Sequence, residues 1–177
     1  MDISKSENNG TMNNTDRAAA YLQELEAEYT ATKKCLERIP ESLYDFKPHP
    51  KSMTMGYLVL LVAEIPNWIT YMVEKGEIDF ATFPHFEAKT TKELTDHFEE
   101  NFLSAKTALQ NASDDKLEGD FQLKNNGQII YTMSKIVDIG TTLNHWVHHR
   151  GQLTVYMRLN DIAVPSIYGP SADEKVF

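Results

Sequence analysis

The sequence predicts an all-α fold, an antiparallel four-helix bundle with a short β-hairpin before the last long helix. Three observations lead to this prediction. Four separate stretches repeat apolar residues at a spacing of about 3.5–3.6, which is typical of amphipathic helices. Capping residues, glycine or proline bound each stretch. The 177 residues are enough for one domain with a substantial core. We expect the helices near residues 16–38, 55–75, 91–112 and 135–159.

The first predicted helix follows a polar N-terminal tail. Residues 1–14 are rich in Asn, Ser and charge and bury little apolar surface, so we expect them to be disordered. The folded domain then spans residues 15–177. Thr15 or Asp16 is the predicted N-cap of the helix, and Pro40 ends it.

The second predicted helix begins after Thr54, a plausible N-cap, and stops at Gly76. Pro66 lies inside it. Because proline removes one backbone hydrogen bond, we expect a kink near residues 62–64. Glu64 is the only carboxylate in the apolar first half of this helix. Two interpretations of Glu64 are possible, namely a solvent-exposed position or a functional role.

The third helix opens with a capping box, in which Thr90 and Glu93 satisfy each other's backbone N–H groups. A loop rich in aromatic residues, 77–89, precedes it. Further on, the strand-like segments 121–124 and 128–131 flank Asn-Asn-Gly, a hairpin signal. Ser134 then caps the fourth helix.

Charge and composition exclude several function classes. The net charge of −9 argues against nucleic-acid binding, which needs a basic surface. The single cysteine, Cys35, excludes an internal disulfide and fits a reducing cytoplasm, and its place in an amphipathic pattern favours a structural role. Neither a signal peptide nor an apolar run of transmembrane length is evident. We therefore expect a cytoplasmic protein that binds no membrane.

A stripe of polar residues lies on the apolar face of the fourth helix. His145 and His149 sit one above the other, and Thr141, Gln152 and Tyr156 share the stripe. Buried polar groups without partners cost about 1–3 kcal/mol each, so the stripe implies a partner. Two histidines at i and i+4 can bind one metal ion. Alternatively, they are core histidines that hydrogen-bond to other helices; His148 points about 60° away.

Four segments resemble the DinB/YfiT-like superfamily. In the C-terminal half these are residues 145–152, HWVHHRGQ, and residues 165–173, PSIYGPSAD. In the second-helix region they are residues 51–53, KSM, and residues 62–68, VAEIPNW. The resemblance covers roughly residues 41–173, and it is the combination of the two C-terminal motifs that makes it specific.

The resemblance implies a four-helix bundle, often dimeric, that binds a divalent metal, nickel or zinc, through three histidines. Two correspond to His145 and His149. The third should precede the Ala-Glu-Ile-Pro segment by two positions, where this chain has Leu61. Glu64, one turn further, could replace it and give a His₂Glu set. His49 is a weaker substitute. The alternative is that this protein has lost the metal and kept the fold.

The characterised members of this superfamily include thiol-dependent S-transferases and a maleylpyruvate isomerase. The resemblance therefore implies two possible classes of function. The first is an enzyme in which a metal activates a low-molecular-weight thiol, with Gln152 and Tyr156 orienting the bound molecule. The second is a non-catalytic binding or stress-response module. We also expect a homodimer, because Trp68, Tyr71 and the aromatic residues of 80–86 exceed the needs of one core.

Overall fold

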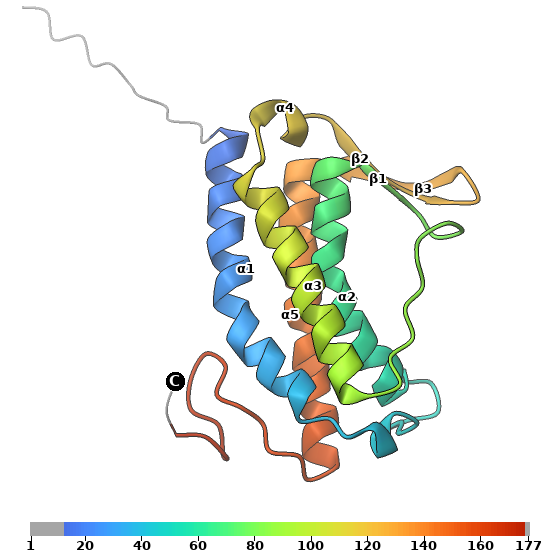
Figure 1. Cartoon of the computed structure of the whole chain (residues 1–177), viewed down its shortest axis with the longest axis vertical. Coiled ribbons are helices and arrows are strands. Elements are labelled where there is room, and N and C mark those ends of the chain that lie inside the picture. The colour runs from blue at the N-terminus through green and yellow to red at the C-terminus, as the bar shows by residue number, and fades with distance from the viewer. Residues whose placement is uncertain (1–12, 176–177) are drawn as a thin grey trace, which may run out of the picture.

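The computed structural model describes residues 13–175 and confirms a four-helix bundle with a small sheet at one end (Figure 1). The bundle helices are α1 (Asn14–Glu37), α2 (Met55–Glu74), α3 (Thr91–Gln110) and α5 (Lys135–Leu159). A 3-10 turn, η1 (Glu41–Leu43), and a one-turn helix, α4 (Asp114–Leu117), lie in the connections. The connection between α3 and the hairpin therefore contains a helical turn.

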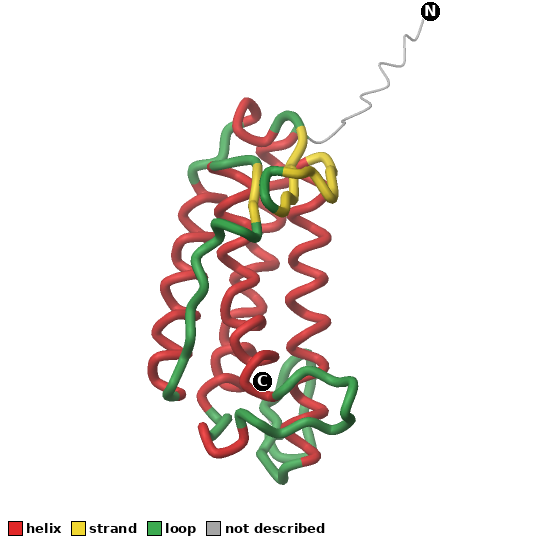
Figure 2. The backbone as a smooth tube through the Cα atoms, turned by 90° about the vertical axis from the view of Figure 1, so that its right-hand side faces the viewer, coloured by secondary structure: helices red, strands yellow, loops and turns green. Residues whose placement is uncertain are grey.

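The order of the helices around the bundle places α2 and α5 side by side. Each of α1 and α2 packs against both α3 and α5, and α1 and α2 lie diagonally opposite. α2 and α5 are antiparallel, since Met72 meets Thr142 and Met53 meets Tyr156. α2 and α3 run in the same direction because the connection between them returns along the length of the bundle (Figure 2).

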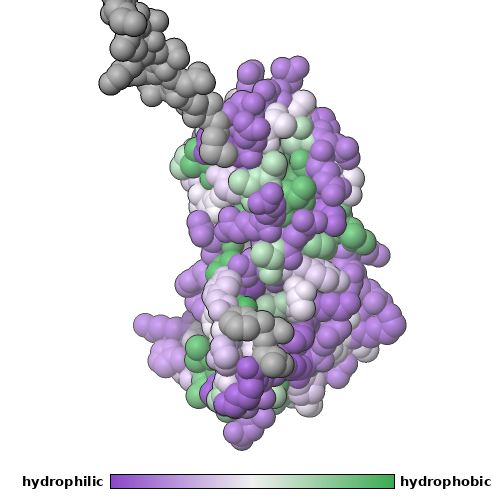
Figure 3. Space-filling view, turned by 90° about the vertical axis from the view of Figure 1, so that its left-hand side faces the viewer, coloured by the Kyte–Doolittle hydropathy of each residue, from purple (hydrophilic) through white to green (hydrophobic). Residues whose placement is uncertain are grey.

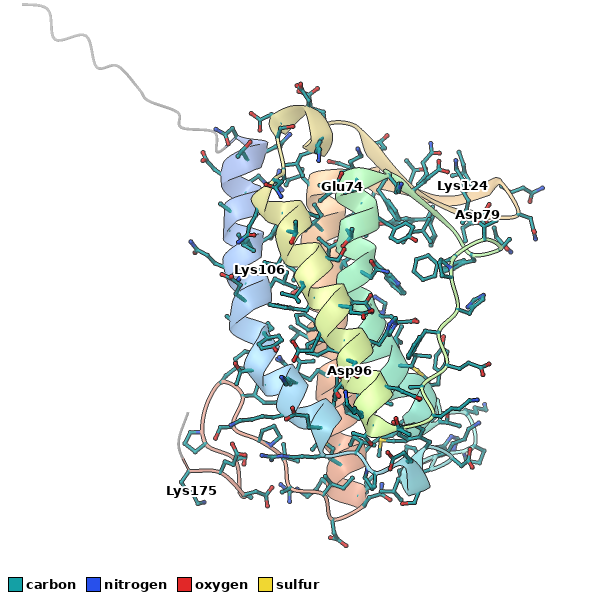
Figure 4. The ribbon with its side chains drawn as sticks, in the orientation of Figure 1. Glu74, Asp79, Asp96, Lys106, Lys124 and Lys175 are labelled. Carbon is teal, nitrogen blue, oxygen red and sulfur yellow. The ribbon has the colours of Figure 1, made fainter. Side chains whose placement is uncertain are left out.

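The sheet has three strands, β1 (Glu77–Asp79), β2 (Asp120–Asn125) and β3 (Gln128–Ser134), in the order β1-β2-β3. The predicted hairpin is present as β2 and β3 around the left-handed residues Asn126 and Gly127. β1, inside a predicted loop, adds to β2 in parallel. The Asp79 carboxylate accepts the Asn126 and Gly127 N–H groups, which fixes the turn, and Lys124 lies beside it (Figure 4).

The helix caps agree with the sequence prediction for two of the four bundle helices. Thr54 caps α2, and the capping box of Thr90 and Glu93 is present at α3. The cap of α1 is Asn13, whose side chain accepts from the Asp16 N–H, in place of Thr15 or Asp16. Ser134 precedes α5 but makes no side-chain cap hydrogen bond. Of the predicted disordered tail, residues 1–12 lie outside the described part, while Asn13 and Asn14 cap and begin α1.

Pro66 lies within α2 and leaves one backbone carbonyl for another helix to use. Proline has no N–H, so the carbonyl of Val62, four residues earlier, lacks its usual helical donor. The indole Nε1–H of Trp146 on α5 donates to this oxygen at 2.8 Å, in a fully buried position. Next to it, the Asn101 amide of α3 donates to the Ala63 carbonyl at 3.0 Å. The proline position thus joins α2 to both of its neighbours.

α2 is long and apolar enough to cross a membrane by length and composition alone, which corrects the sequence-based expectation that no run reaches that length. In the structure it lies in the bundle and supplies core residues such as Val59, Val62, Ile65 and Ile69. The molecular surface on the α1 side is mostly hydrophilic, with scattered apolar patches (Figure 3).

The chain after α5 packs back onto the bundle through ion pairs. Glu174 pairs with Lys34 and Arg38 of α1, which lowers the pKa of Glu174 to about 2. Asp173 pairs with Arg158 of α5 at 2.5 Å. The hydroxyl of Tyr168 reaches a buried Arg150–Glu28 pair between α5 and α1. Residues 162–175 are therefore an ordered part of the fold.

Candidate metal centre and adjoining pocket

His145 and His149 face each other on the side of α5 that meets α2. Their Nε2 atoms are 2.7 Å apart and their ring centroids 4.5 Å apart. His149 is buried and His145 is half-buried. The i, i+4 spacing on one helix produces this arrangement. His148 is exposed, and its ring lies 5.1 Å from that of His149.

Gln152 holds His149 in one tautomer. Its side-chain oxygen Oε1 lies 2.8 Å from His149 Nδ1. Because a carbonyl oxygen only accepts, Nδ1 carries the proton and Nε2 presents its lone pair to His145. A hydrogen bond from the outer ring nitrogen is the usual way in which proteins orient a metal-binding histidine. Gln152 therefore orients the ring of His149 toward His145.

The surroundings keep both imidazoles uncharged at neutral pH. Burial lowers the pKa of His145, and the neighbouring rings of His149 and His148 lower it further. Burial also lowers the pKa of His149, partly opposed by the Gln152 hydrogen bond. A neutral imidazole is the form that binds a metal ion.

The geometry of the two rings fits a shared divalent cation. Two nitrogens bound to one tetrahedral zinc ion at 2.0–2.1 Å lie about 3.3 Å apart, so a small rotation of the rings opens the required space. His145 must then carry its proton on Nδ1, a change of tautomer that leaves it uncharged. Within residues 13–175, however, no three His, Cys, Asp or Glu side chains converge on one point. The residues present therefore supply two ligands.

Leu61 lies on the face of α2 that turns toward α5. The Trp68 ring is 5.5 Å from the His145 ring, and Met72 contacts Thr142. Leu61 precedes Trp68 by seven residues, so it lies about 20° from it around the helix, on the Met72 side. The half-buried Leu61 thus occupies the position from which a longer polar side chain would reach the histidine pair.

Glu64 turns away from the histidine pair. It lies about 40° from Trp68 on the side opposite Leu61. Its carboxylate is 3.5 Å from Nε2 of His97 on α3, and the His97 ring stacks on Phe86 at 3.9 Å. The structure thus does not bring Glu64 to His145 and His149. His49 is exposed, and its Nδ1 accepts from the Lys51 N–H.

An apolar pocket of about 390 Å³ opens beside His145, between α2, α5 and the sheet. His145, Thr141, Thr142 and Asp138 line it from α5, and Trp68 lines it from α2. The remaining lining side chains are mainly apolar and aromatic: Met72, Ile78, Phe80, Phe121, Leu123 and Tyr131. A pocket of this size and lining is typical of small-molecule sites.

A second pocket, also about 390 Å³, lies between the C-terminal part of α5 and the segment that precedes α2. Gln152 and Tyr156, the predicted cofactor-binding residues, line it together with Lys51. The Tyr156 hydroxyl donates to the Met53 carbonyl at 3.3 Å, and its ring packs edge-on against Phe46. These contacts give Tyr156 a structural role in addition to its place in the pocket wall.

Residues 12–175 match the family model described as the DinB family. The chain belongs to the DinB family. The match spans the four bundle helices, the sheet and the ordered C-terminal segment, and it confirms the resemblance found in the sequence motifs.

Solved DinB-like structures share the fold. A DinB-like protein from Bacillus subtilis matches with a TM-score of 0.65 at 16% identity, covering 89% of this chain and 99% of that one. One from Bacillus cereus ATCC 10987 matches with a TM-score of 0.66 at 22% identity, covering 85% and 97%. A member from Exiguobacterium sibiricum 255-15 matches with a TM-score of 0.62 at 15% identity, covering 85% and 96%.

A curated relative is similar over a short stretch. The uncharacterized protein YrdA of Bacillus subtilis strain 168 is 53% identical over 32 residues, which are 18% of this chain and 19% of that protein. The matched stretch spans about a fifth of that relative.

Several residues around this DinB site were missed by reasoning from the sequence. Asp138 is seven residues before His145 and therefore shares its helix face, a signal that could have placed it in the pocket. Tyr131 and Phe121 come from the hairpin, whose position against α5 no local pattern reveals. Cys35 agrees with the structural role expected for it, because burial raises the pKa of its thiol to about 11.

Proposed function

We propose that this DinB-family protein is a cytoplasmic, divalent-metal-dependent thiol S-transferase with a weakened metal site. The observation that carries the proposal is the facing Nε2 pair of His145 and His149, with His149 oriented by Gln152. The metal would be Ni²⁺ or Zn²⁺, since both bind imidazole nitrogen. No part of this proposal depends on nucleic acid or a membrane.

Each residue of the site has a distinct role in this proposal. A bound divalent ion lowers the pKa of a thiol and makes the thiolate available at neutral pH. His145 and His149 would hold the ion, and Gln152 fixes the ring of His149. The apolar pocket beside His145 takes the electrophilic substrate, and the pocket beside Gln152 and Tyr156 takes the thiol, with Lys51 available for an anionic group. In the transfer, the thiol would release its S–H proton to solvent, its sulfur would form a C–S bond at the electrophilic carbon, and the leaving group would depart with the electron pair of the bond that breaks.

The alternative function is a non-catalytic binding or stress-response module that has lost the metal. Leu61 and the Glu64–His97 contact favour it, because they leave two protein ligands where catalytic zinc sites generally have three. Under this alternative, the histidine pair is a buried hydrogen bond and the pockets bind a ligand without chemistry.

A turnover assay distinguishes the two functions. Purified protein with a simple thiol and an electrophilic aromatic substrate should show slow S-transfer that depends on added Ni²⁺ or Zn²⁺. His145→Ala should eliminate it, because a site with two ligands does not tolerate the loss of one. The matched control, His148→Ala, removes an exposed imidazole on the same helix and should retain the activity. Turnover that persists after exhaustive chelation, or in His145→Ala, would refute the metal-dependent mechanism.

We also propose that the protein is a two-fold homodimer formed through β3. Of the aromatic residues first expected at an interface, Tyr71 packs on Phe83 and Phe86 packs on His97, whereas Phe80 is exposed. β3 is an edge strand that carries no charge, and Ile129, Ile130, Tyr131 and Met133 on it are exposed. Edge strands usually carry charges that prevent pairing. In a chain of net charge −9, this uncharged edge is where a second copy meets least repulsion.

Sedimentation tests the dimer. We expect wild type to sediment as a dimer at tens of micromolar and Ile130→Lys to be monomeric, since the lysine places a charge on the paired edge. Leu103→Lys is the control, because Leu103 is equally exposed but lies on α3. A monomeric wild type, or an Ile130→Lys variant that remains dimeric, would contradict the proposal.

A further inference from the structure

The carboxylate of Asp138 is buried in the wall of the pocket beside His145, and the pocket residues around it carry no positive charge. Asp138 is 5% exposed and lines this pocket. Its Oδ1 accepts the Tyr131 hydroxyl at 3.0 Å. Its Oδ2 receives no hydrogen bond from residues 13–175, and no salt bridge within that range includes Asp138. Burial raises the pKa of Asp138, because a buried carboxylate is costly unless it is paired, so a cation at Oδ2 would stabilise the charged form.

The pocket wall is chemically suited to a cation. Four aromatic rings line the pocket, and they come from different parts of the chain: Trp68 of α2, Phe80 just after β1, Phe121 of β2 and Tyr131 of β3. Aromatic faces attract ammonium groups, most strongly where water is excluded. None of the described residues that line the pocket is a lysine or an arginine. The pocket therefore combines one buried negative group with aromatic walls and lacks a built-in cation.

We propose that this pocket binds a small organic cation, an ammonium group on an apolar body, with the ammonium on Asp138 Oδ2. The apolar body lies against the aromatic residues and extends toward His145, which is two helical turns, about 10 Å, from Asp138 along α5. Thr141 and Thr142, between them on the same helix, provide the polar atoms along the path. This binding needs no metal at the histidine pair.

The Asp138 carboxylate disfavours two other classes of ligand relative to an ammonium. An anion of the same shape meets the Asp138 carboxylate without a compensating cation. A neutral alcohol can donate to Oδ2, but it leaves the buried charge without a counter-charge. The expected order of affinity is therefore ammonium, then alcohol, then carboxylate.

Binding of three probes with one aromatic body tests the proposal. 2-Phenylethylamine, 2-phenylethanol and 3-phenylpropanoate are titrated into chelator-treated full-length protein, with heat and tryptophan fluorescence as readouts. Trp68 lines the pocket, so occupancy should alter its emission. We expect the amine to bind about ten-fold or more tightly than the alcohol, and the carboxylate not to bind.

Substitution of the carboxylate completes the test. Asp138→Asn should weaken amine binding about ten-fold or more and leave alcohol binding nearly unchanged. Asp120→Asn, an exposed acidic residue at the start of β2, should change neither. Equal affinity of wild type for amine and alcohol, no binding of the amine, or amine binding unaffected by Asp138→Asn would each overturn the proposal. The wild-type preference needs no variant, so a misfolded Asp138→Asn leaves the test intact.

The result is separable from the proposed transferase function. Because the titration uses metal-free protein, failure of amine binding leaves metal binding at His145 and His149 unaffected. Conversely, a protein that binds no metal can still show the amine preference.

Discussion

Replacing Arg150 with methionine should lower the free energy of unfolding by about 3–5 kcal/mol. Arg150 is 2% exposed, and its guanidinium pairs with the carboxylate of Glu28 on α1. It also donates to Thr32 Oγ1 at 3.2 Å and to the Tyr168 hydroxyl at 2.9 Å. The substitution leaves the Glu28 carboxylate buried without a counter-charge, which accounts for the size of the effect. Denaturant unfolding of the purified protein measures it.

Two further variants separate this effect from a general loss of packing. Arg158→Met, on the same helix, removes a more exposed pair with Asp173 and should lower the stability far less. The double variant Glu28→Met with Arg150→Met should be more stable than Arg150→Met alone, because it removes the buried charge. An Arg150→Met variant as stable as Arg158→Met would show that the buried pair does not join α1 to α5.

Replacing Leu61 with histidine should tighten Zn²⁺ or Ni²⁺ binding by about ten-fold or more. Leu61 lies between the angular positions of Trp68 and Met72, both of which contact α5. A third imidazole there completes the ligand number of catalytic zinc sites and leaves one position open. Calorimetric titration of each ion into wild type and variant measures the change.

The control for the tighter metal binding of Leu61→His is the same substitution at the neighbouring residue, Leu60. Leu60→His adds an imidazole about 100° further around α2, on the side away from Met72, and should leave the affinity unchanged. If Leu61→His also leaves the affinity unchanged, Leu61 does not face the histidine pair. The interpretation of Leu61 as the lost ligand position would then be wrong.

Features set by local sequence were predicted well. The starts of α2 and α3 follow from the local signals of Thr54 and the capping box at Thr90, and the hairpin turn follows from Asn126 and Gly127. These signals act within a few residues of the chain, so a single sequence contains them. The facing of His145 and His149 follows from helical periodicity in the same way.

Features set by contacts between distant segments were not predicted. β1 becomes a strand only because β2 lies beside it, more than forty residues later. In the sequence, Arg150 is only one residue of the C-terminal motif. Its ion pair with Glu28, 122 positions earlier, appears only in the fold. The family resemblance made Glu64 a substitute for the third metal ligand, but its carboxylate lies next to His97 on α3. The hydrogen bond that Pro66 removes from α2 is replaced from a distant segment, because the Val62 carbonyl accepts from Trp146 on α5.

Metal binding by the histidine pair is the central claim, and a titration of Zn²⁺ and Ni²⁺ into protein made without an affinity tag tests it most directly. We expect wild type and His148→Ala to bind one ion per chain, and His145→Ala and His149→Ala to lose that binding, because each removes one of the two facing Nε2 atoms. Circular dichroism confirms that all four proteins are folded. Wild type that binds no ion, or a folded His145→Ala and His149→Ala double variant that binds as wild type does, would contradict the account.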